Sequence, residues 1–266
     1  MKGDEDFVVW GSQGRPLRNV RSIRKDPQVL FEARLCRACN TTRSQPFDRA
    51  YDRYAEYVSA VAAGELGFLH TVRSTTLDPA PPPDDYVKTS GGIFRDCSVH
   101  DFDAVRYVTG QEVVEVYATG SNQGAAIFAE NNDVDTAATI LTLESGTLAL
   151  VSNSRYNPRG HDVRLELHGS KDSVAAGLEP KWPIRSTEPG VTFPDGKPHY
   201  FFMDRFADAF RRELTAFTDV VTGKITSPCT VANAVEVDWV AEAATMSLHR
   251  HRPIRMDEIR EPVAVS

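Results

Sequence analysis

The chain of 266 residues has no apolar run approaching the roughly 18 residues that a membrane-spanning helix needs. Its N-terminal stretch, MKGDEDFVVW, lacks the apolar core of a secretory signal. It also lacks a long Lys/Arg-rich segment, and its formal net charge is −7, which argues against nucleic acid or an anionic membrane as a partner. We therefore expect a cytoplasmic protein that binds a small neutral or polar ligand.

Cysteine is scarce: four residues, Cys36, Cys39, Cys97 and Cys229, are too few and too scattered for a disulfide framework in a chain of this length. Cys36 and Cys39 form a CxxC pair, but neither a second pair nor a nearby histidine pair accompanies it. We interpret the pair as a chance spacing and expect no metal site.

Residues 1–40 show neither a period of two nor a period of 3.6 in their apolar positions. We expect that segment to be poorly ordered, and a folded domain to occupy residues 41–266. The composition, 41% hydrophobic and 25% charged, is typical of such a domain.

Helical spacing begins at Phe47 and stops near Gly64, where the first helix is expected. Alternation and turn residues then predict strands over residues 68–78, 113–118, 135–143, 147–154 and 163–168, and helices over 93–109, 200–222 and 231–249. This order favours an α+β fold with a large, mostly antiparallel, open-faced sheet and helices on one face. The other face would serve homo-oligomerisation, as a dimer or tetramer.

The stretch GGIFRDCSVHDFD contains the most informative side chains. In a helix, Asp96, His100 and Asp103 stand at i, i+4 and i+7 and line one face. A histidine beside a carboxylate can act as a general base on a hydroxyl group near neutral pH. The alternative is a solvated polar helix face, which has the same spacing.

This stretch closely resembles the catalytic helix of the glucose–fructose oxidoreductase and inositol dehydrogenase family, with its double glycine, D-x-x-x-H pair and later Asp. Four further segments match in order: GELGFLHTVRSTTLDPAPPPDDY, DVDTAATILTLESGTLALVSNSR, HDVRLELHGSKD, and FADAFRRELTAFTDVVTGK with the RPIRMDEI tail. The resemblance covers residues 47–260. It implies that residues 41–266 form that family's substrate-binding, catalytic and oligomerisation domain.

By this resemblance, His100 would remove the hydroxyl proton of a polyol or sugar while hydride leaves for a nicotinamide, and Asp96 would orient His100. Asp103 would bind a neighbouring hydroxyl. Thr76 and Asp78 align with polyol contacts and share one strand face, although a polar edge-strand face has the same pattern. His161 stands where the inositol enzymes usually carry Tyr, as a pocket wall.

The family's Rossmann unit, with G-x-G-x-x-G, has no counterpart in this sequence. The Glu-Lys-Pro motif is also absent, and Gln45-Pro46-Phe47-Asp48 replaces the usual Arg-Arg-Phe/Tyr-Asp. The resemblance implies NAD or NADP as the cofactor. Because the nucleotide-binding motifs are absent, we expect no cofactor-binding residue in this chain and no cofactor binding by this chain alone. We hypothesise that the missing nucleotide-binding half reflects a truncated or frame-disrupted gene.

Three functions remain open. The first is an inositol-2-dehydrogenase-like oxidoreductase, inactive without its nucleotide-binding half. The second is a non-catalytic binding or assembly subunit that pairs through its sheet with a full-length relative. The third is a metal-dependent hydrolase or isomerase with Asp96, His100, Asp103 and Asp78 as ligands. Nothing in the sequence separates inositol from other cyclic polyols or sugars, or NAD from NADP.

Overall fold

The computed structural model describes residues 58, 60–178, 181–191 and 196–260. The chain divides into two units, Met1–Arg49 and Ala50–Ser266, and every described residue belongs to the second. The expected N-terminal segment 1–40, the CxxC pair and most of the helix expected from Phe47 lie outside the described residues.

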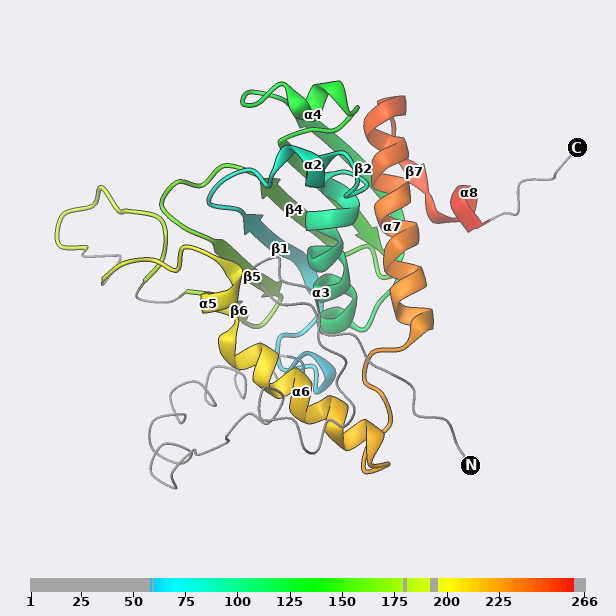
Figure 1. Cartoon of the computed structure of the whole chain (residues 1–266). Helices are drawn as coiled ribbons and strands as arrows, with labels where there is room; N and C mark the ends of the chain where they lie inside the picture. The colour runs from blue at the N-terminus through cyan, green and yellow to red at the C-terminus, as the bar shows by residue number, and fades with distance from the viewer. Residues whose placement is uncertain (1–57, 59, 179–180, 192–195, 261–266) are drawn as a thin grey trace, which may run out of the picture. The chain divides into compact units, whose positions relative to one another are not determined.

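One seven-stranded sheet forms the centre of the second unit, in the order β6-β5-β1-β4-β3-β2-β7 (Figure 1). All neighbouring strands pair antiparallel except β1 and β4, which run parallel. The strands are β1 (Leu69–Leu77), β2 (Val113–Ser121), β3 (Thr136–Leu143), β4 (Leu148–Ser154), β5 (Asp162–Gly169), β6 (Ser173–Ala176) and β7 (Ile254–Arg255). The predicted α+β class and the mostly antiparallel sheet are confirmed, but the central parallel pair was not expected.

The helix expected over 93–109 is two joined pieces: a π-helix, η2, followed directly by α3, which ends at Gly110 with a φ of 62°. The helix expected over 200–222 is also divided, into α5 and α6. The helices are α2 (Asp84–Val87), η2 (Phe94–Ser98), α3 (Val99–Thr109), α4 (Ile127–Glu130), α5 (Phe202–Arg205), α6 (Ala207–Val221), α7 (Val231–Arg250) and α8 (Met256–Arg260).

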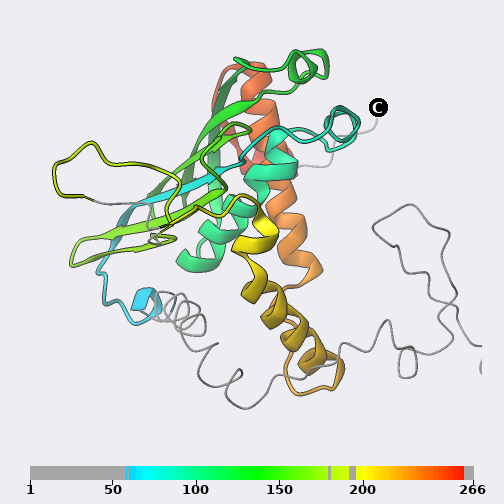
Figure 2. The same cartoon turned by 60° about the vertical axis from the view of Figure 1, so that its left-hand side comes forward.

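Helices α3 and α7 lie on one face of the sheet, as Figure 2 shows from the side. The core forms between them and the sheet, and its members include Phe102, Val116, Leu141 and Ala244, none of which is exposed. Burying each large side chain of this kind contributes roughly 1.5–3 kcal/mol. Hydrophobic burial therefore fixes η2 and α3 against the strands.

The opposite face of the sheet carries apolar side chains at its centre. Tyr117, Ile140 and Leu150 are direct neighbours across β2, β3 and β4, and Arg73 continues the row on β1. The three apolar residues are 38%, 40% and 38% exposed. We call these four residues the outer row; they lie on the sheet face opposite the core.

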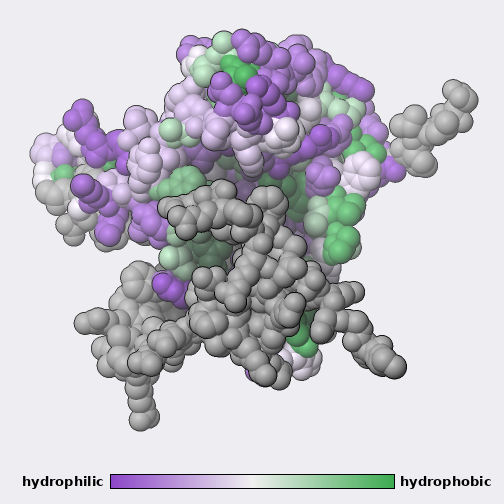
Figure 3. Space-filling model, viewed as in Figure 1, coloured by the Kyte–Doolittle hydropathy of each residue, from purple (hydrophilic) through white to green (hydrophobic). Residues whose placement is uncertain are grey.

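Apolar side chains are also exposed on the last two long helices. Leu214, Phe217 and Val221 of α6 are more than 60% exposed, and Val231 of α7 is 82% exposed. Figure 3 shows hydrophobic groups over the N-terminal half of α7. No helix in the described part of the chain is long and apolar enough to cross a bilayer.

Candidate active site

Two glycines open the helix that carries the predicted residues. Gly91 and Gly92 have φ values of 83° and 90°, a region that L side chains rarely adopt. A Cβ on Gly92 would lie 3.1 Å from Asp133 Oδ1, and that oxygen accepts the Ile93 N–H at 2.9 Å. Glycine therefore lets Asp133 approach closely and satisfy one of the unpaired amides of the first helical turn.

The π-helix η2 places Asp96 at the end of the sheet. Single π turns inside α-helices are frequent at functional sites. Within η2 the side chains of Phe94, Cys97 and Ser98 are buried, while that of Asp96 is 14% exposed. Asp96 thus stays reachable from one side while Phe94, Cys97 and Ser98 pack into the core.

Arg155 joins Asp96 to Asp78. Its side chain is only 4% exposed; Nη1 donates to Asp78 Oδ2 at 2.9 Å and Nη2 donates to Asp96 Oδ2 at 2.5 Å. Asp78 follows β1, Arg155 follows β4, and the Asp78 N–H donates to the Ser154 carbonyl. Because parallel strands end at the same edge, the β1/β4 pairing brings these two residues together.

Two further side chains complete this cluster. The Tyr86 hydroxyl donates to Asp96 Oδ1 at 2.5 Å, and this hydrogen bond is the main cause that raises the pKa of Tyr86. His161 Nε2 lies 3.8 Å from Asp78 Oδ1, and its ring packs edge-on against Phe206. Burial lowers the pKa of His161, so its ring is neutral at pH 7. We call Tyr86, Asp78, Asp96, Arg155 and His161 the carboxylate cluster.

The other predicted residues lie elsewhere. His100 is exposed on the first turn of α3, and in the described part of the chain no hydrogen bond joins it to Asp96. The side chain of Asp103 is 57% exposed, with an oxygen 4.0 Å from Arg106 Nη1. Thr76 is buried and its hydroxyl donates to Asp101 Oδ1 at 3.0 Å. The structure thus brings Asp78, Asp96 and His161 together, and directs Thr76 into the interior.

Asp101 is a buried carboxylate that sequence reasoning missed. It is 2% exposed and accepts hydrogen bonds from Ser74 Oγ at 2.5 Å, Thr76 Oγ1 and Asn153 Nδ2 at 2.7 Å. Burial raises its pKa, against the effect of these hydrogen bonds. The shared face of Ser74 and Thr76 on β1 was the available signal, since two adjacent buried hydroxyls require a partner.

Arg155 was missed as well. The signal was its position directly after the second strand of the predicted hairpin, but its partner Asp78 lies on a strand far away in the sequence. Only the parallel pairing of β1 with β4 makes them neighbours.

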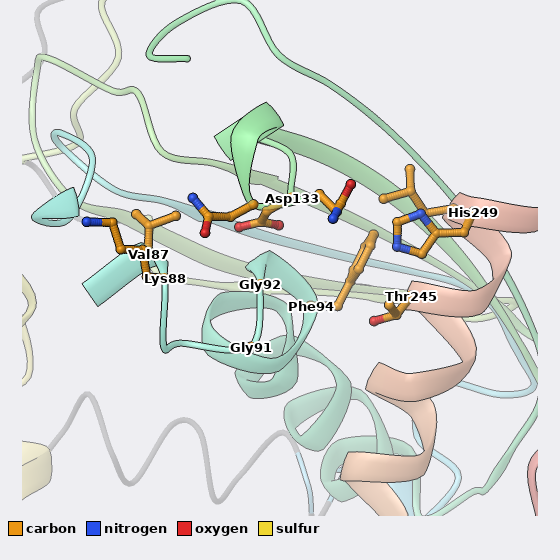
Figure 4. A pocket seen from close by; sticks show the side chains of 11 residues that line it. Val87, Lys88, Gly91, Gly92, Phe94, Asp133, Thr245 and His249 are labelled. Carbon is orange, nitrogen blue, oxygen red and sulfur yellow. The ribbon is translucent and has the colours of Figure 1, made fainter. Parts of the chain in front are cut away.

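A cavity of about 220 Å³ lies beside the carboxylate cluster rather than within it, and Figure 4 shows Asp133 between Lys88 and His249. It is lined by the end of α2, the double glycine and start of η2, the segment after α4 and the C-terminal part of α7, and by none of the predicted site residues. The carboxylate at its centre, Asp133, already caps η2 through one oxygen. We therefore place the candidate active site at the carboxylate cluster and the neighbouring surface of α3.

The metal-dependent alternative gains no support from the geometry. Among the residues that the structure describes, no three His, Cys, Asp or Glu side chains stand close enough together to hold a metal ion. Asp78 and Asp96 are instead neutralised in part by Arg155.

Comparison with known proteins finds a matching family model and similar oxidoreductases. Residues 54–175 match the GFO/IDH/MocA C-terminal domain. The chain is 37% identical over 212 residues to an uncharacterized oxidoreductase, YrbE, of Bacillus subtilis. The matched region covers 79% of this chain and 62% of the relative. It is 36% identical over 246 residues to a myo-inositol 2-dehydrogenase of Thermotoga maritima. That matched region covers 91% of this chain and 69% of the relative.

A solved structure shows the same fold. The scyllo-inositol dehydrogenase of Lactobacillus casei, with bound NAD(H) and scyllo-inositol, matches with a TM-score of 0.66 and 28% identity, over 80% of this chain and 63% of that one. The chain thus spans about three fifths to two thirds of the length of these relatives. On its sequence and its fold, the chain belongs to the GFO/IDH/MocA oxidoreductase family.

Proposed function

We propose that this chain is the substrate-binding part of an inositol-2-dehydrogenase-like oxidoreductase, which acts on a CH–OH group of a cyclic polyol or sugar. The observation that carries the proposal is the carboxylate cluster, in which Asp96 of the D-x-x-x-H motif meets Asp78 from a distant strand through Arg155. Carboxylates and a tyrosine hydroxyl at a partly exposed edge are suited to hydrogen bonding with the hydroxyl groups of a sugar-like ring.

In this proposal, each residue of the site has a definite task. His100, the histidine of the D-x-x-x-H motif, accepts the proton of the reacting hydroxyl; its side chain is exposed on the first turn of α3 and so is open to a ligand. Asp78 and Asp103 accept hydrogen bonds from neighbouring hydroxyls, and His161 forms the inner wall. Asp96 holds Tyr86 in place. Thr76 acts indirectly, since its hydroxyl is engaged with Asp101.

The cofactor that we propose is NAD or NADP, which would accept the hydride from the carbinol carbon. The described residues do not fit a dinucleotide site: their only parallel strand pair is β1/β4, and no G-x-G-x-x-G turn lies between them. We therefore propose that this chain does not turn over alone. The exposed apolar side chains of Leu214, Phe217 and Val221 on α6 support this proposal, because such a face usually packs against another surface.

Homo-oligomerisation is proposed through the outer row. Tyr117, Ile140 and Leu150 make it mostly apolar, and one end carries a charged residue, Arg73, whose neighbour on β5 is Glu166; an apolar interface core with a charged rim has this arrangement. The same surface would serve the second function, a non-catalytic subunit that pairs with a full-length relative.

Calorimetric titration of the purified chain with myo-inositol tests the proposal, each run with and without NAD or NADP. We expect inositol binding that is weakened at least tenfold in Asp78→Asn, because the variant loses an ionised acceptor. Lys171→Gln, at an exposed position in the turn between β5 and β6, is the control and should bind as the parent does. Tight dinucleotide binding, or inositol binding unchanged in Asp78→Asn, would contradict the assignment.

A further inference from the structure

Arg155 is a buried cation whose two terminal nitrogens are each engaged by a different carboxylate. Nη1 donates to Asp78 and Nη2 to Asp96, at 2.9 and 2.5 Å. A guanidinium group is rigid and planar, so it fixes the separation and orientation of both carboxylates at once. Burial lowers the pKa of Arg155, but its neighbours, the two carboxylates among them, raise it more strongly, so the guanidinium stays charged.

The two oxygens that Arg155 does not engage, Oδ1 of Asp96 and Oδ1 of Asp78, have different partners. Oδ1 of Asp96 accepts the Tyr86 hydroxyl. Oδ1 of Asp78 faces His161 Nε2 at 3.8 Å, which is longer than a hydrogen bond. The Asp78 side chain is 24% exposed, whereas that of Arg155 is 4% exposed. The Asp78 carboxylate is therefore partly open to a ligand at this edge, whereas the guanidinium is enclosed.

We propose that Arg155 is a positioning residue that holds Asp78 and Asp96 as a fixed pair and, by engaging Asp78 through Oδ2, leaves Oδ1 available to accept a hydroxyl of a neutral polyol. The identity of the ligand rests on the function proposed above. The positioning of the pair by Arg155 stands on the contacts alone.

The charges of the cluster extend this inference to ligand selection. Two carboxylates face one guanidinium, and His161 supplies no second positive charge at pH 7 because burial keeps its ring neutral. The cluster is thus net negative. The two carboxylates would repel a sugar acid, and Arg155 could not offset that repulsion, since it is buried and already paired with both of them.

The first test is independent of any ligand and follows Tyr86. The full chain is labelled with ¹³C at Tyr Cζ, the Tyr86 resonance is assigned with Tyr86→Phe, and its titration is compared in the parent, Arg155→Lys and Arg155→Gln. If Arg155 positions Asp96, both variants loosen the Tyr86–Asp96 hydrogen bond and move the Tyr86 pKa down towards 10.0.

A role of Arg155 as a mere charge gives the opposite result. The charge of Arg155 lowers the Tyr86 pKa, so Arg155→Gln would raise it further and Arg155→Lys would leave it unchanged. Either outcome overturns the positioning role. Arg155→Lys retains the buried positive charge, so it keeps the test valid if Arg155→Gln fails to fold.

The second test measures binding of myo-inositol and of D-glucuronate, a ring of similar size with one negative charge, to the full chain by calorimetry. We expect the parent to prefer myo-inositol, and Arg155→Lys to bind it about tenfold more weakly or worse under conditions in which its circular dichroism spectrum matches that of the folded parent. Lys171→Gln, which removes an exposed cation in the turn between β5 and β6, is the control and should change neither.

The two tests separate the proposals. A parent chain that binds no inositol while Tyr86 responds as expected would contradict the proposed function and leave the positioning role intact. Equal affinity for glucuronate and myo-inositol, or unchanged inositol affinity in Arg155→Lys, would overturn the selection for neutral polyols.

Discussion

The buried carboxylate of Asp101 accepts a hydrogen bond of 2.5 Å from the hydroxyl of Ser74 and so ties α3 to β1. A second link runs parallel to it: Asn153 of β4 donates to Asp101 and accepts from Ser98 of η2. The residues on either side of Asp101 are the exposed His100 and the buried Phe102. The position of His100 is therefore set by a polar network in the interior as well as by hydrophobic packing.

Replacing Asp101 by Ala should destabilise the fold. The change leaves Ser74, Thr76 and Asn153 with buried donors and no acceptor, at a cost of about 2–4 kcal/mol in the free energy of unfolding. Urea denaturation followed by circular dichroism measures the loss. Asp103→Ala, an exposed carboxylate on the same helix, should change the stability by less than about 0.5 kcal/mol. Equal effects of the two substitutions would refute the network.

The pH dependence of stability should carry the signature of Asp101. Because burial raises its pKa in the folded state, the folded protein binds the proton more tightly than the unfolded chain does. Asp101 therefore contributes stability at low pH, and this contribution is lost as the pH rises from the unfolded value near 3.8 through the raised folded value. We therefore expect the parent to lose unfolding free energy relative to Asp101→Asn as the pH is raised from about 3, as measured by urea denaturation of both proteins at each pH. A difference that stays constant would show that the folded and unfolded pKa values are the same.

Gly92→Ala should be more damaging than Gly146→Ala. Both glycines have a positive φ, 90° and 86°, so both substitutions incur backbone strain of about 1 kcal/mol. Only at Gly92 does the new Cβ meet a side chain, Asp133, at 3.1 Å, whereas the space around Gly146 is open. We expect thermal unfolding to show a further loss of about 1 kcal/mol for Gly92→Ala. An identical loss in both variants would mean that the contact with Asp133 is unimportant.

Charge on the outer row should break the proposed oligomer. Ile140→Lys and Leu150→Lys place an ammonium group in the apolar centre of that face, where a paired sheet would have to bury it. Size-exclusion chromatography with light scattering should show a smaller species than the parent at equal concentration. Tyr107→Lys, at a 55% exposed position on α3, is the control and should keep the parent's mass. A monomeric parent chain would contradict the oligomer itself.

Local patterns predicted much of the fold. The alternation in residues 68–78 correctly separated the buried Val72, Ser74 and Thr76 from the outward Arg73, because side chains alternate along a strand whatever its neighbours are. The short elements α2, α4 and β6 escaped prediction, since four residues provide too little of a period to be recognised. The junction between η2 and α3 escaped for a related reason: a π turn adds about one residue to a single helical turn, and η2 has only five residues.

The sequence by itself determined the family, the α+β class and the position of the D-x-x-x-H motif on a helix, all of which depend on residue order and local periodicity. Only the tertiary structure decided which charged groups meet. Asp78, Asp96 and Arg155 are separated by 18 and 59 residues along the chain, and they converge because β1 and β4 pair in parallel while η2 packs across their ends. The energy of that pairing lies in contacts between distant segments, and such contacts leave no periodic trace in either segment alone.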